Sequence, residues 1–455
     1  MNKYKTINQS VLSKITPSDD YKKKVDTTLQ KIKKKIKDEI QKRNIPATIE
    51  LVGSIAKDTY LRDNLDMDIF LVFPRTVEKK IIAQETLSLG KTILLETEEC
   101  YAEHPYIRGI YEGFKVELVP CYHIINAADR ITAVDRTPLH TQYVISHLKE
   151  NQKQEVRLFK QFLYGIGCYG AEANVQGFSG YLCELLIIKY NTFEELLADA
   201  AAWVKPIRYS LLTEEIPSFS DPFIFIDPVD PERNVASAVS IETFQYFIHA
   251  CQTYLKNPSI TFFFPNPLEK WTLDRIKKNL IENKSQYIGI QFPKPDIINE
   301  NLIPQLRKAC RNVTQTCTQY GFIINDIQFS IDETNKQVYI ILKADVKPIS
   351  STYTHIGPPT TKKNHVQDFL EKWKNNPEAT SEPYQKNNRI YVEVARKWLT
   401  LESFLLDNIH SIRLGKHLDK ISINLIKILP AKDLIITPLQ EFWTKYLDNK
   451  NSWER

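Results

Sequence analysis

The sequence contains little of what indicates a secreted, zinc-binding or membrane-inserted protein. Its seven cysteines are an odd number without a CxxC pair, which argues against a disulfide framework and against a zinc site. Many of their neighbours are apolar, so we expect reduced and mostly buried thiols. No apolar run approaches the roughly 20 residues that span a bilayer, and the first residues lack the apolar core of a signal peptide. We therefore expect a soluble, cytoplasmic protein.

Glycine is also scarce, with 13 residues against 24 prolines, and the net charge is only +5. So small an excess does not by itself indicate a nucleic-acid partner, although 60 Lys and Arg residues leave room for local basic surfaces. Hydrophobic residues, in contrast, make up 42% of the 455 positions, enough to bury a full core. A chain of this length accommodates about three domains.

Residues 1–140 are predicted to form an α/β domain. Capping residues at Thr16 to Asp20 precede apolar residues at helical spacing, which predicts an amphipathic helix ending near Asn44. We interpret the lysines on its outer side as a solvated face, with phosphate contact as the less favoured alternative. The pattern then predicts strands at 48–52 and 65–73, a helix at 77–92, and a hairpin at 106–120 that turns at Glu112-Gly113.

Residues 141–256 are predicted to be mainly helical. The expected helices lie at 155–164, 179–190, 193–204 and 241–255. Between the last two, Asp227 to Pro231 reads as a rigid loop with two exposed acids.

Residues 257–455 are predicted to have a different order of strands and helices. A strand at 286–291, a helix at 302–320 and strands at 326–331 and 337–344 give a β-α-β-β order. This order predicts a ferredoxin-like or RNA-recognition-like sheet packed on helices. Segments rich in Pro and Lys, at 357–363 and 375–386, are expected to separate it from a final Trp- and Lys-rich part.

The residues that suggest chemistry lie between Gly53 and Phe73. Asp66 and Asp68 occupy alternate positions of an expected strand, so their side chains leave the same face and converge. Two convergent carboxylates are costly to hold together unless cations lie between them. This geometry is typical of a divalent-metal site for phosphoryl or nucleotidyl transfer. The alternative, a solvated acidic pair at a strand end, is disfavoured by the turn that precedes it.

That turn, Gly53-Ser54, lets the backbone approach a phosphate closely and opens a short helix whose N–H groups can face it. Ser54 can donate its hydroxyl, and the ammonium of Lys57 follows one turn later. Two magnesium ions need a third carboxylate. Glu117, on an expected strand with its apolar neighbours facing away, is the best candidate, and a solvated strand glutamate is its alternative.

At this point the sequence resembles the archaeal, class I CCA-adding enzymes, members of the polymerase-β-like nucleotidyltransferase superfamily. The turn and acidic strand alone mark only the superfamily, whereas the later blocks make the resemblance specific. It covers about residues 10–345 and is weak beyond them. The later blocks are 101–106 (YAEHPY), 119–122 (VPCY), 133–138 (AVDRTP), 169–172 (YGAE), 177–186 (GFSGYLCELL), 227–230 (DPVD), 233–235 (RNV), 294–297 (KPDI) and 301–306 (NLIPQL).

The resemblance implies a multidomain α+β protein that adds C, C and A to the 3′ end of tRNA from CTP and ATP, without a template. It implies a nucleotidyltransferase head at 1–140, a helical neck at 141–256, and an α+β body and tail at 257–455. Together these parts would clamp the acceptor and TΨC arms of tRNA. The oligomeric state stays open, with a homodimer as one option.

The resemblance also assigns roles to single residues. The implied ligands of two Mg²⁺ ions are Asp66, Asp68 and Glu117, and the implied nucleotide contacts are Ser54, Lys57, His140, Lys160, Tyr169 and, for the incoming base, Arg233. Taken alone, His140 reads as a helix-start histidine, Lys160 and Tyr169 as surface or boundary residues, and Arg233 as a partner of Asp230 or Glu232. Candidate tRNA contacts in the tail, with a solvated basic surface as an equal alternative, are Arg389, Arg396, Lys397, Arg413, Lys416 and His417.

Three positions depart from the family. Glu117 stands where aspartate is usual, Lys57 where arginine is common, and Gln176 where a basic residue is frequent. The competing functions are a poly(A)-polymerase-like or oligoadenylate-synthase-like nucleotidyltransferase, and a non-catalytic RNA-binding relative. The last would be marked by loss of a carboxylate, and none of the three is lost.

Overall fold

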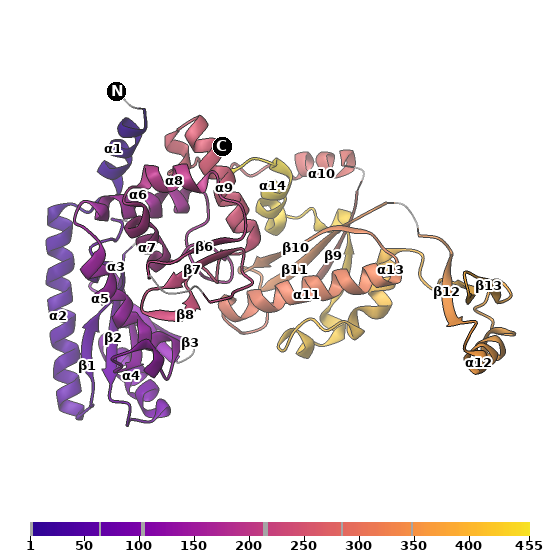
Figure 1. Cartoon of the computed structure of the whole chain (residues 1–455), viewed down its shortest axis with the longest axis horizontal. Helices are drawn as coiled ribbons and strands as arrows, with labels where there is room; N and C mark the ends of the chain where they lie inside the picture. Colours follow the sequence, from indigo (N-terminus) through magenta and orange to yellow (C-terminus); the bar gives the residue numbers. More distant parts are fainter. Residues whose placement is uncertain (1–2, 63–64, 102–104, 213–216, 284, 347–348) are drawn as a thin grey trace. The chain divides into compact units, whose positions relative to one another are not determined.

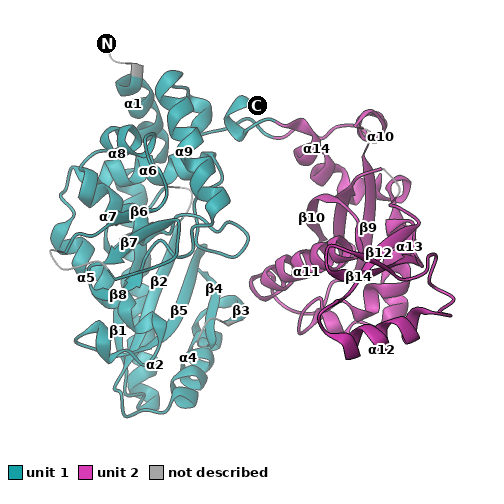
Figure 2. Ribbon diagram, turned by 45° about the vertical axis from the view of Figure 1, so that its right-hand side comes forward, with its two compact units in different colours: residues 1–267, 450–455 teal, residues 268–449 magenta. Residues whose placement is uncertain are grey.

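The protein, described from a computed structural model, consists of two compact units (Figure 2). The description covers residues 3–62, 65–101, 105–212, 217–283, 285–346 and 349–455, so Ala102, Glu103 and His104 of the YAEHPY block lie outside it. The first unit comprises residues 1–267 with 450–455, and the second comprises 268–449. Predicted head and neck sections thus share one unit, and the division at residues 140 and 256 stays a prediction.

A five-stranded sheet in the order β1-β2-β5-β4-β3 forms the first part of unit 1 (Figure 1). Its strands are β1 (Thr48–Leu51), β2 (Asp66–Phe73), β3 (Leu95–Tyr101), β4 (Pro105–Tyr111) and β5 (Phe114–Tyr122). Only β2 and β5 pair in parallel, and the other neighbours are antiparallel. The predicted hairpin and its turn are confirmed, whereas β3 was not predicted.

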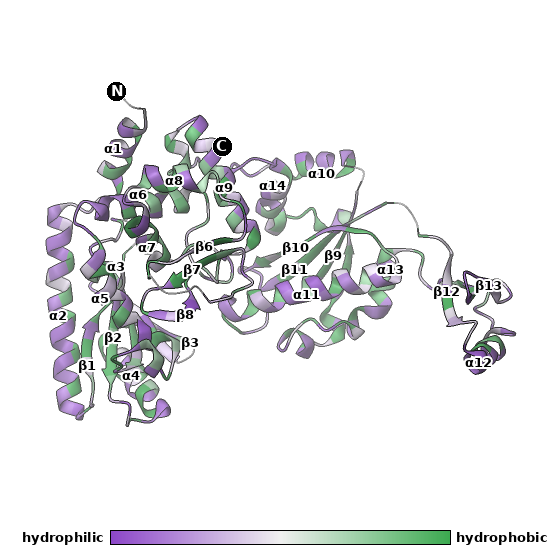
Figure 3. Ribbon diagram, viewed as in Figure 1, coloured by the Kyte–Doolittle hydropathy of each residue, from purple (hydrophilic) through white to green (hydrophobic). Residues whose placement is uncertain are grey.

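Two helices, α2 (Asp19–Arg43) and α4 (Lys79–Ile93), bury their apolar sides on one face of this sheet. The predicted start of α2 is confirmed, because the Ser18 side chain accepts a hydrogen bond from the Tyr21 N–H. Asn44 ends it in the left-handed conformation, and the lysine-rich outer side is hydrophilic (Figure 3). The preceding helix α1 (Lys3–Ile15) packs against the helical part of the unit instead.

That helical part has an aromatic core built on buried phenylalanines such as Phe159, Phe178 and Phe247. It comprises α5 (Thr137–His147), α6 (Gln152–Gly165), α7 (Gly180–Tyr190), α8 (Phe193–Ala200) and α9 (Ile241–Lys256), with the short strands β6 (Ile207–Tyr209), β7 (Phe223–Asp227) and β8 (Asp230–Asn234). The prediction of a loop with two exposed acids is wrong. Asp227 ends β7 and Asp230 begins β8, and their exposed fractions are 0% and 3%.

Unit 2 contains a four-stranded antiparallel sheet in the order β10-β11-β9-β15. Its elements are β9 (Gln286–Pro293), α11 (Asn299–Tyr320), β10 (Ile324–Asp332), β11 (Gln337–Ala344), α13 (Leu401–Asn408) and β15 (Lys427–Pro430). This order, with α11 and α13 on one face, confirms the predicted ferredoxin-like sheet. The helices α10 (Leu273–Glu282) and α14 (Gln440–Asp448) cover the other face.

A small three-stranded sheet is inserted between β11 and α13. It consists of β12 (Thr352–Pro359), β14 (Arg389–Ala395) and β13 (Tyr384–Lys386), with α12 (Lys363–Trp373) packed on it. The expectation that 357–363 and 375–386 are mere separators is therefore wrong, since both contribute to this subdomain. All seven cysteines are buried free thiols, as predicted. None of the described helices is both long and apolar enough to cross a membrane.

Candidate active site

A tight turn brings the end of β1 against the acidic strand. The one-turn helix α3 (Gly53–Ala56) follows β1, and Gly53 has a φ of +71°, which side chains of L-residues rarely adopt. A Cβ at this position would lie 1.8 Å from Oδ2 of Asp68. Glycine is required here because the Asp68 carboxylate lies against the backbone of the turn. Ser54, the next residue, is partly exposed beside this contact.

The alternation predicted for β2 is confirmed. Met67, Ile69 and Leu71 are fully buried in the core under α2 and α4, so Asp66 and Asp68 leave the opposite face. On the adjacent strand β5, Glu117 is the direct partner of Asp68 in the parallel register. Asp68 and Glu117, with Gly53 and Tyr106, line a cavity of about 280 Å³.

Glu117 does not simply converge with the two aspartates. Its Oε1 accepts a hydrogen bond from Arg108 Nε on β4 at 2.8 Å, and Arg108 Nη2 lies 2.6 Å from the same oxygen in an ion pair. Within the described residues, no group of three or more His, Cys, Asp or Glu side chains is gathered closely enough to hold a metal ion. Asp68 and Glu117 thus line one cavity, and the Glu117 side chain has Arg108 as its cationic partner.

Electrostatic repulsion acts on Asp68. Burial, followed by the charges of Glu117 and Asp66, raises the pKa of Asp68 to about 7. The ammonium groups of Lys57 and Lys160 act in the opposite direction. A divalent cation between the carboxylates would remove this repulsion, and carboxylate oxygens are the ligands that Mg²⁺ prefers.

Lys57 and Lys160 meet at one buried carboxylate, that of Glu184 on α7. Lys57 Nζ lies 2.5 Å from Glu184 Oε2, and Lys160 Nζ lies 3.2 Å from Oε1. Thr59 also donates to Oε1, at 2.6 Å. Burial acts to raise the pKa of Glu184, but the two ammonium groups outweigh it and hold this pKa below its usual range. Lys160 is therefore no surface residue, since only 2% of it is exposed.

Tyr169 joins the same region. Its ring stacks on Tyr164 with 4.2 Å between centroids. A Cβ on Gly180 would lie 3.0 Å from the Tyr169 hydroxyl oxygen and 3.8 Å from Lys160 Nζ, so these two polar groups flank the start of α7. Three predicted nucleotide contacts from separate segments, Lys57, Lys160 and Tyr169, thus come together.

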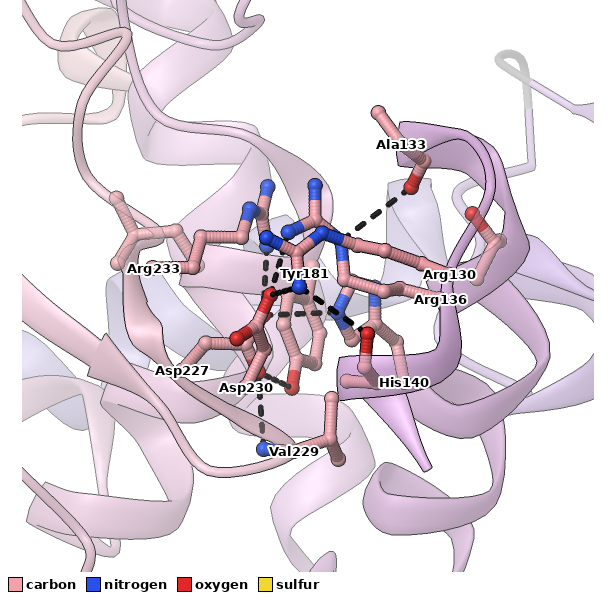
Figure 4. Close-up of polar contacts among 12 residues, drawn as sticks. Arg130, Ala133, Arg136, His140, Tyr181, Asp227, Val229, Asp230 and Arg233 are labelled. Carbon is pink, nitrogen blue, oxygen red and sulfur yellow. Dashed lines mark hydrogen bonds and ion pairs between the residues drawn. The ribbon is translucent and has the colours of Figure 1, made fainter. Parts of the chain in front are cut away.

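The two remaining predicted contacts meet at Asp227 (Figure 4). His140 Nε2 and Arg233 Nη1 both lie 2.8 Å from its Oδ2. Tyr181, stacked on His140 at 4.1 Å, donates its hydroxyl to Oδ1 at 3.0 Å. Burial acts to raise the pKa of Asp227, but the hydrogen bonds and charges of His140 and Arg233 bring it to about 2. Arg233 therefore pairs with neither Asp230 nor Glu232, the partners expected from sequence alone.

The comparisons with known proteins cover most of the chain. Family models match residues 33–140 (nucleotidyltransferase domain), 154–264 (tRNA nucleotidyltransferase, second domain) and 284–429 (CCA-adding enzyme, C-terminal domain). The CCA-adding enzyme of Thermoplasma volcanium is 36% identical over 426 residues, 93% of each chain. That of Methanosarcina barkeri is 33% identical over 90% of each chain. That of Saccharolobus islandicus is 37% identical over 80% of this chain and 84% of its own.

The chain belongs to the CCA-adding enzyme family. The resemblance drawn from the sequence blocks is thereby confirmed, as is the expectation of an enzyme. Against this background Glu184 is the functional candidate that sequence reasoning missed, although it lies inside the quoted GFSGYLCELL block. A lone carboxylate among apolar residues on one helix was the available signal, because a buried charge requires a counterion.

Four of the six predicted tRNA contacts in the tail, Arg389, Arg396, Lys397 and His417, have partners within the protein. Arg396 donates to the carbonyl of Tyr320, and its guanidinium lies 5.2 Å from the ring centroids of both Tyr320 and Tyr353. Lys397 Nζ is 3.7 Å from Asp407, and His417 is hydrogen-bonded to Gln305. That these residues contact tRNA stays a prediction.

The raised pKa of Asp68 predicts that stability depends on pH when divalent cations are absent. This pKa is about 7 in the native protein but about 3.9 in an unfolded chain, so the folded state holds the proton more tightly. The resulting stabilisation is full below about pH 4 and is lost as the pH rises through about 7. In Asp68→Asn the thermal unfolding midpoint should change less with pH between about pH 5 and 8 than in the wild type. The control Asp26→Asn, at an exposed position, should keep the wild-type pH dependence. Mg²⁺ should raise the wild-type midpoint most at the alkaline end, and an equal rise in Asp68→Asn would contradict this account.

The shared carboxylate predicts a large stability loss for Glu184→Gln. The amide leaves two buried ammonium groups without a counterion, which costs about 3–5 kcal/mol in comparable buried pairs. Urea unfolding followed by circular dichroism measures it. Glu155→Gln is the matched control, because the Glu155 carboxylate on α6 accepts a backbone N–H from Phe193 rather than an ammonium. Equal losses in the two variants would show that the lysines do not depend on Glu184.

Proposed function

We propose that this protein adds C, C and A to the 3′ end of tRNA from CTP and ATP, without a template, and releases pyrophosphate. The observation that carries the proposal is the cavity at which Asp68 and Glu117 face each other, in a chain whose relatives are CCA-adding enzymes along most of their length. A non-catalytic RNA-binding relative is disfavoured because Asp66, Asp68 and Glu117 are all present.

We further propose that Asp66, Asp68 and Glu117 hold two Mg²⁺ ions. Oxygen donors on adjacent strands suit this ion. The three side chains are not gathered closely enough for a metal ion in the described structure, so the proposal requires the Glu117 carboxylate to turn from Arg108 toward the aspartates. Bound Mg²⁺ supplies a lowered pKa for the attacking 3′ hydroxyl and charge stabilisation for the departing pyrophosphate. The protein's part is to hold the carboxylates in register, with Gly53 leaving space for Asp68.

The nucleotide is proposed to bind between the turn and the helices. Ser54 and Lys57 are the proposed contacts to its phosphates, and His140, Lys160 and Tyr169 are further proposed contacts to the nucleotide. Two ammonium groups, those of Lys57 and Lys160, share the single carboxylate of Glu184. This excess of basic groups favours an anionic ligand beside them, although burial lowers the pKa of Lys160. Arg233 is the proposed contact to the base, because a guanidinium presents several N–H donors in one plane.

tRNA is proposed to bind through its acceptor and TΨC arms, with unit 2 contributing. The match of residues 284–429 to the C-terminal domain of CCA-adding enzymes supports this role. The acceptor stem would be recognised by shape and backbone, since A-form RNA hides its major-groove edges. Seven buried free thiols suit a reducing compartment, which supports a cytoplasmic location. A homodimer remains one option for the assembly.

Incorporation assays test the function directly. With tRNA lacking its terminal CCA, CTP alone should extend the tRNA by two residues, ATP alone by none, and both by three. Asp68→Ala should abolish incorporation, because the carboxylate that we assign to the metal is gone, while leaving tRNA binding within about twofold. The products are resolved on sequencing gels, and binding is measured by filter retention. Unlimited addition of A without C would contradict the proposal, and activity that survives Asp68→Ala would contradict the metal mechanism.

A further inference from the structure

A single buried carboxylate joins three elements of unit 1. Asp227, at the end of β7 and fully buried, accepts hydrogen bonds from His140 on α5, Tyr181 on α7 and Arg233 on β8. The backbone N–H of Val229 adds a fourth, at 3.1 Å from Oδ1. Figure 4 shows these side chains converging on Asp227. No role was assigned to this residue from the sequence.

We infer that Asp227 is a positioning residue that fixes the guanidinium of Arg233 and thereby sets which incoming base is accepted. The inference rests on the proposed role of Arg233 toward the base. Asp227 itself, with no exposed surface, is out of reach of a nucleotide, so it acts through Arg233.

The first argument is geometric. The Arg233 side chain is 31% exposed, and an arginine this accessible samples several rotamers unless it is tethered. Its Nη1 is held 2.8 Å from Asp227 Oδ2, while its other N–H groups have no hydrogen-bond partner among the described residues. One end of the planar group is therefore anchored and the rest is available to a ligand. Cytosine and adenine differ from uracil and guanine in where donors and acceptors lie, so a guanidinium distinguishes them only from a fixed position.

The second argument concerns the anchor itself. Oδ1 of Asp227 is occupied by Tyr181 and Val229, so the carboxylate cannot rotate away from Arg233. It also stays ionised across the physiological range, which keeps the bond to Arg233 charge-assisted and about twice as strong as a neutral one. His140 Nε2 shares Oδ2 with Arg233, so the same carboxylate oxygen holds another proposed nucleotide contact and the proposed base contact.

The segment that precedes α5 fixes the position of His140. Thr132 and Asp135 form a capping box at the start of the short helix Ala133–Arg136, which leads directly into α5. Asp135 also accepts the backbone N–H of Tyr122 at 2.8 Å, which ties this segment to the end of β5. The sheet thus fixes the start of α5, which carries His140. Because His140 and Arg233 both bind Asp227, the position of Arg233 also depends on the sheet.

The chain supplies a matched control in Asp230. It lies three residues away on β8, is 3% exposed, and pairs with Arg136 at 2.6 Å and Arg130 at 3.4 Å. Loss of either carboxylate removes a buried anion between cationic side chains. Only Asp227 contacts Arg233.

The experiment measures fidelity on the full-length protein. Wild type, Asp227→Asn, Asp230→Asn, Arg233→Lys and the Asp227→Asn/Arg233→Lys double variant are compared in kcat/KM for CTP against UTP, and for ATP against GTP, on tRNA that lacks CCA or only the final A. We expect Asp227→Asn to lower both discrimination ratios about tenfold, the size of one lost base-reading contact. Asp230→Asn should leave the ratios within about twofold. The double variant should be no less selective than Arg233→Lys alone, because both changes remove the same contact.

Tyr181→Phe provides a milder test should Asp227→Asn fold poorly. It removes one tether of Asp227 without touching Arg233, and the ratios should fall by about threefold. Unchanged ratios in Asp227→Asn or in a folded Tyr181→Phe, equal losses in Asp230→Asn, or additive losses in the double variant would each overturn the inference. Failure of the proposed function looks different, since the wild type would then not prefer CTP and ATP at all.

Discussion

Carboxylates that lie close together in a half-buried site repel one another, and the first unit is arranged around that repulsion. Burial is the largest cause of the raised pKa of Asp68, and the neighbouring charges of Glu117 and Asp66 add to it. The surrounding residues supply positive charge by two routes. Arg108 binds Glu117 from the neighbouring strand, and the charges of Lys57 and Lys160 act to lower the pKa of Asp68. These side chains offset part of the negative charge of the carboxylates.

The same principle holds the helical part of the unit to the sheet. Two buried acids, Glu184 on α7 and Asp230 on β8, pair with cationic side chains that come earlier in the chain. Asp227 on β7 pairs with Arg233, which follows it, and with the earlier His140, whose pKa is lowered by burial. Because a buried charge without a partner is very costly, these pairs allow few relative placements of the segments. Three of these cationic partners, Lys57, Lys160 and Arg233, are also proposed to contact the nucleotide. Substrate binding and correct folding therefore depend on the same charges.

Local patterns explain what could be predicted. Alternation in β2 showed which face carries Asp66 and Asp68, and the cap at Ser18 showed where α2 begins. The β-α-β-β order identified the sheet of unit 2. The errors arose where a polar residue finds a distant partner. Asp227 and Asp230 looked exposed because their sequence neighbours are Pro residues and acids. Arg233 is close in sequence but was expected to pair with Asp230 or Glu232, and the partners His140, Arg130 and Arg136 lie about 90 positions earlier.

Sequence alone determined the strand periodicity, the glycine turn, the set of acidic side chains and the family, since each depends on residues close together or on blocks matched one by one. Tertiary structure decided which groups meet. The parallel pairing of β2 with β5 places Asp68 opposite Glu117. The antiparallel pairing of β4 with β5 places Arg108 opposite Glu117. Lys57 and Glu184 are 127 positions apart, and His140 and Asp227 are 87 apart. Contacts over such separations follow from the packing of whole elements, which local spacing does not encode.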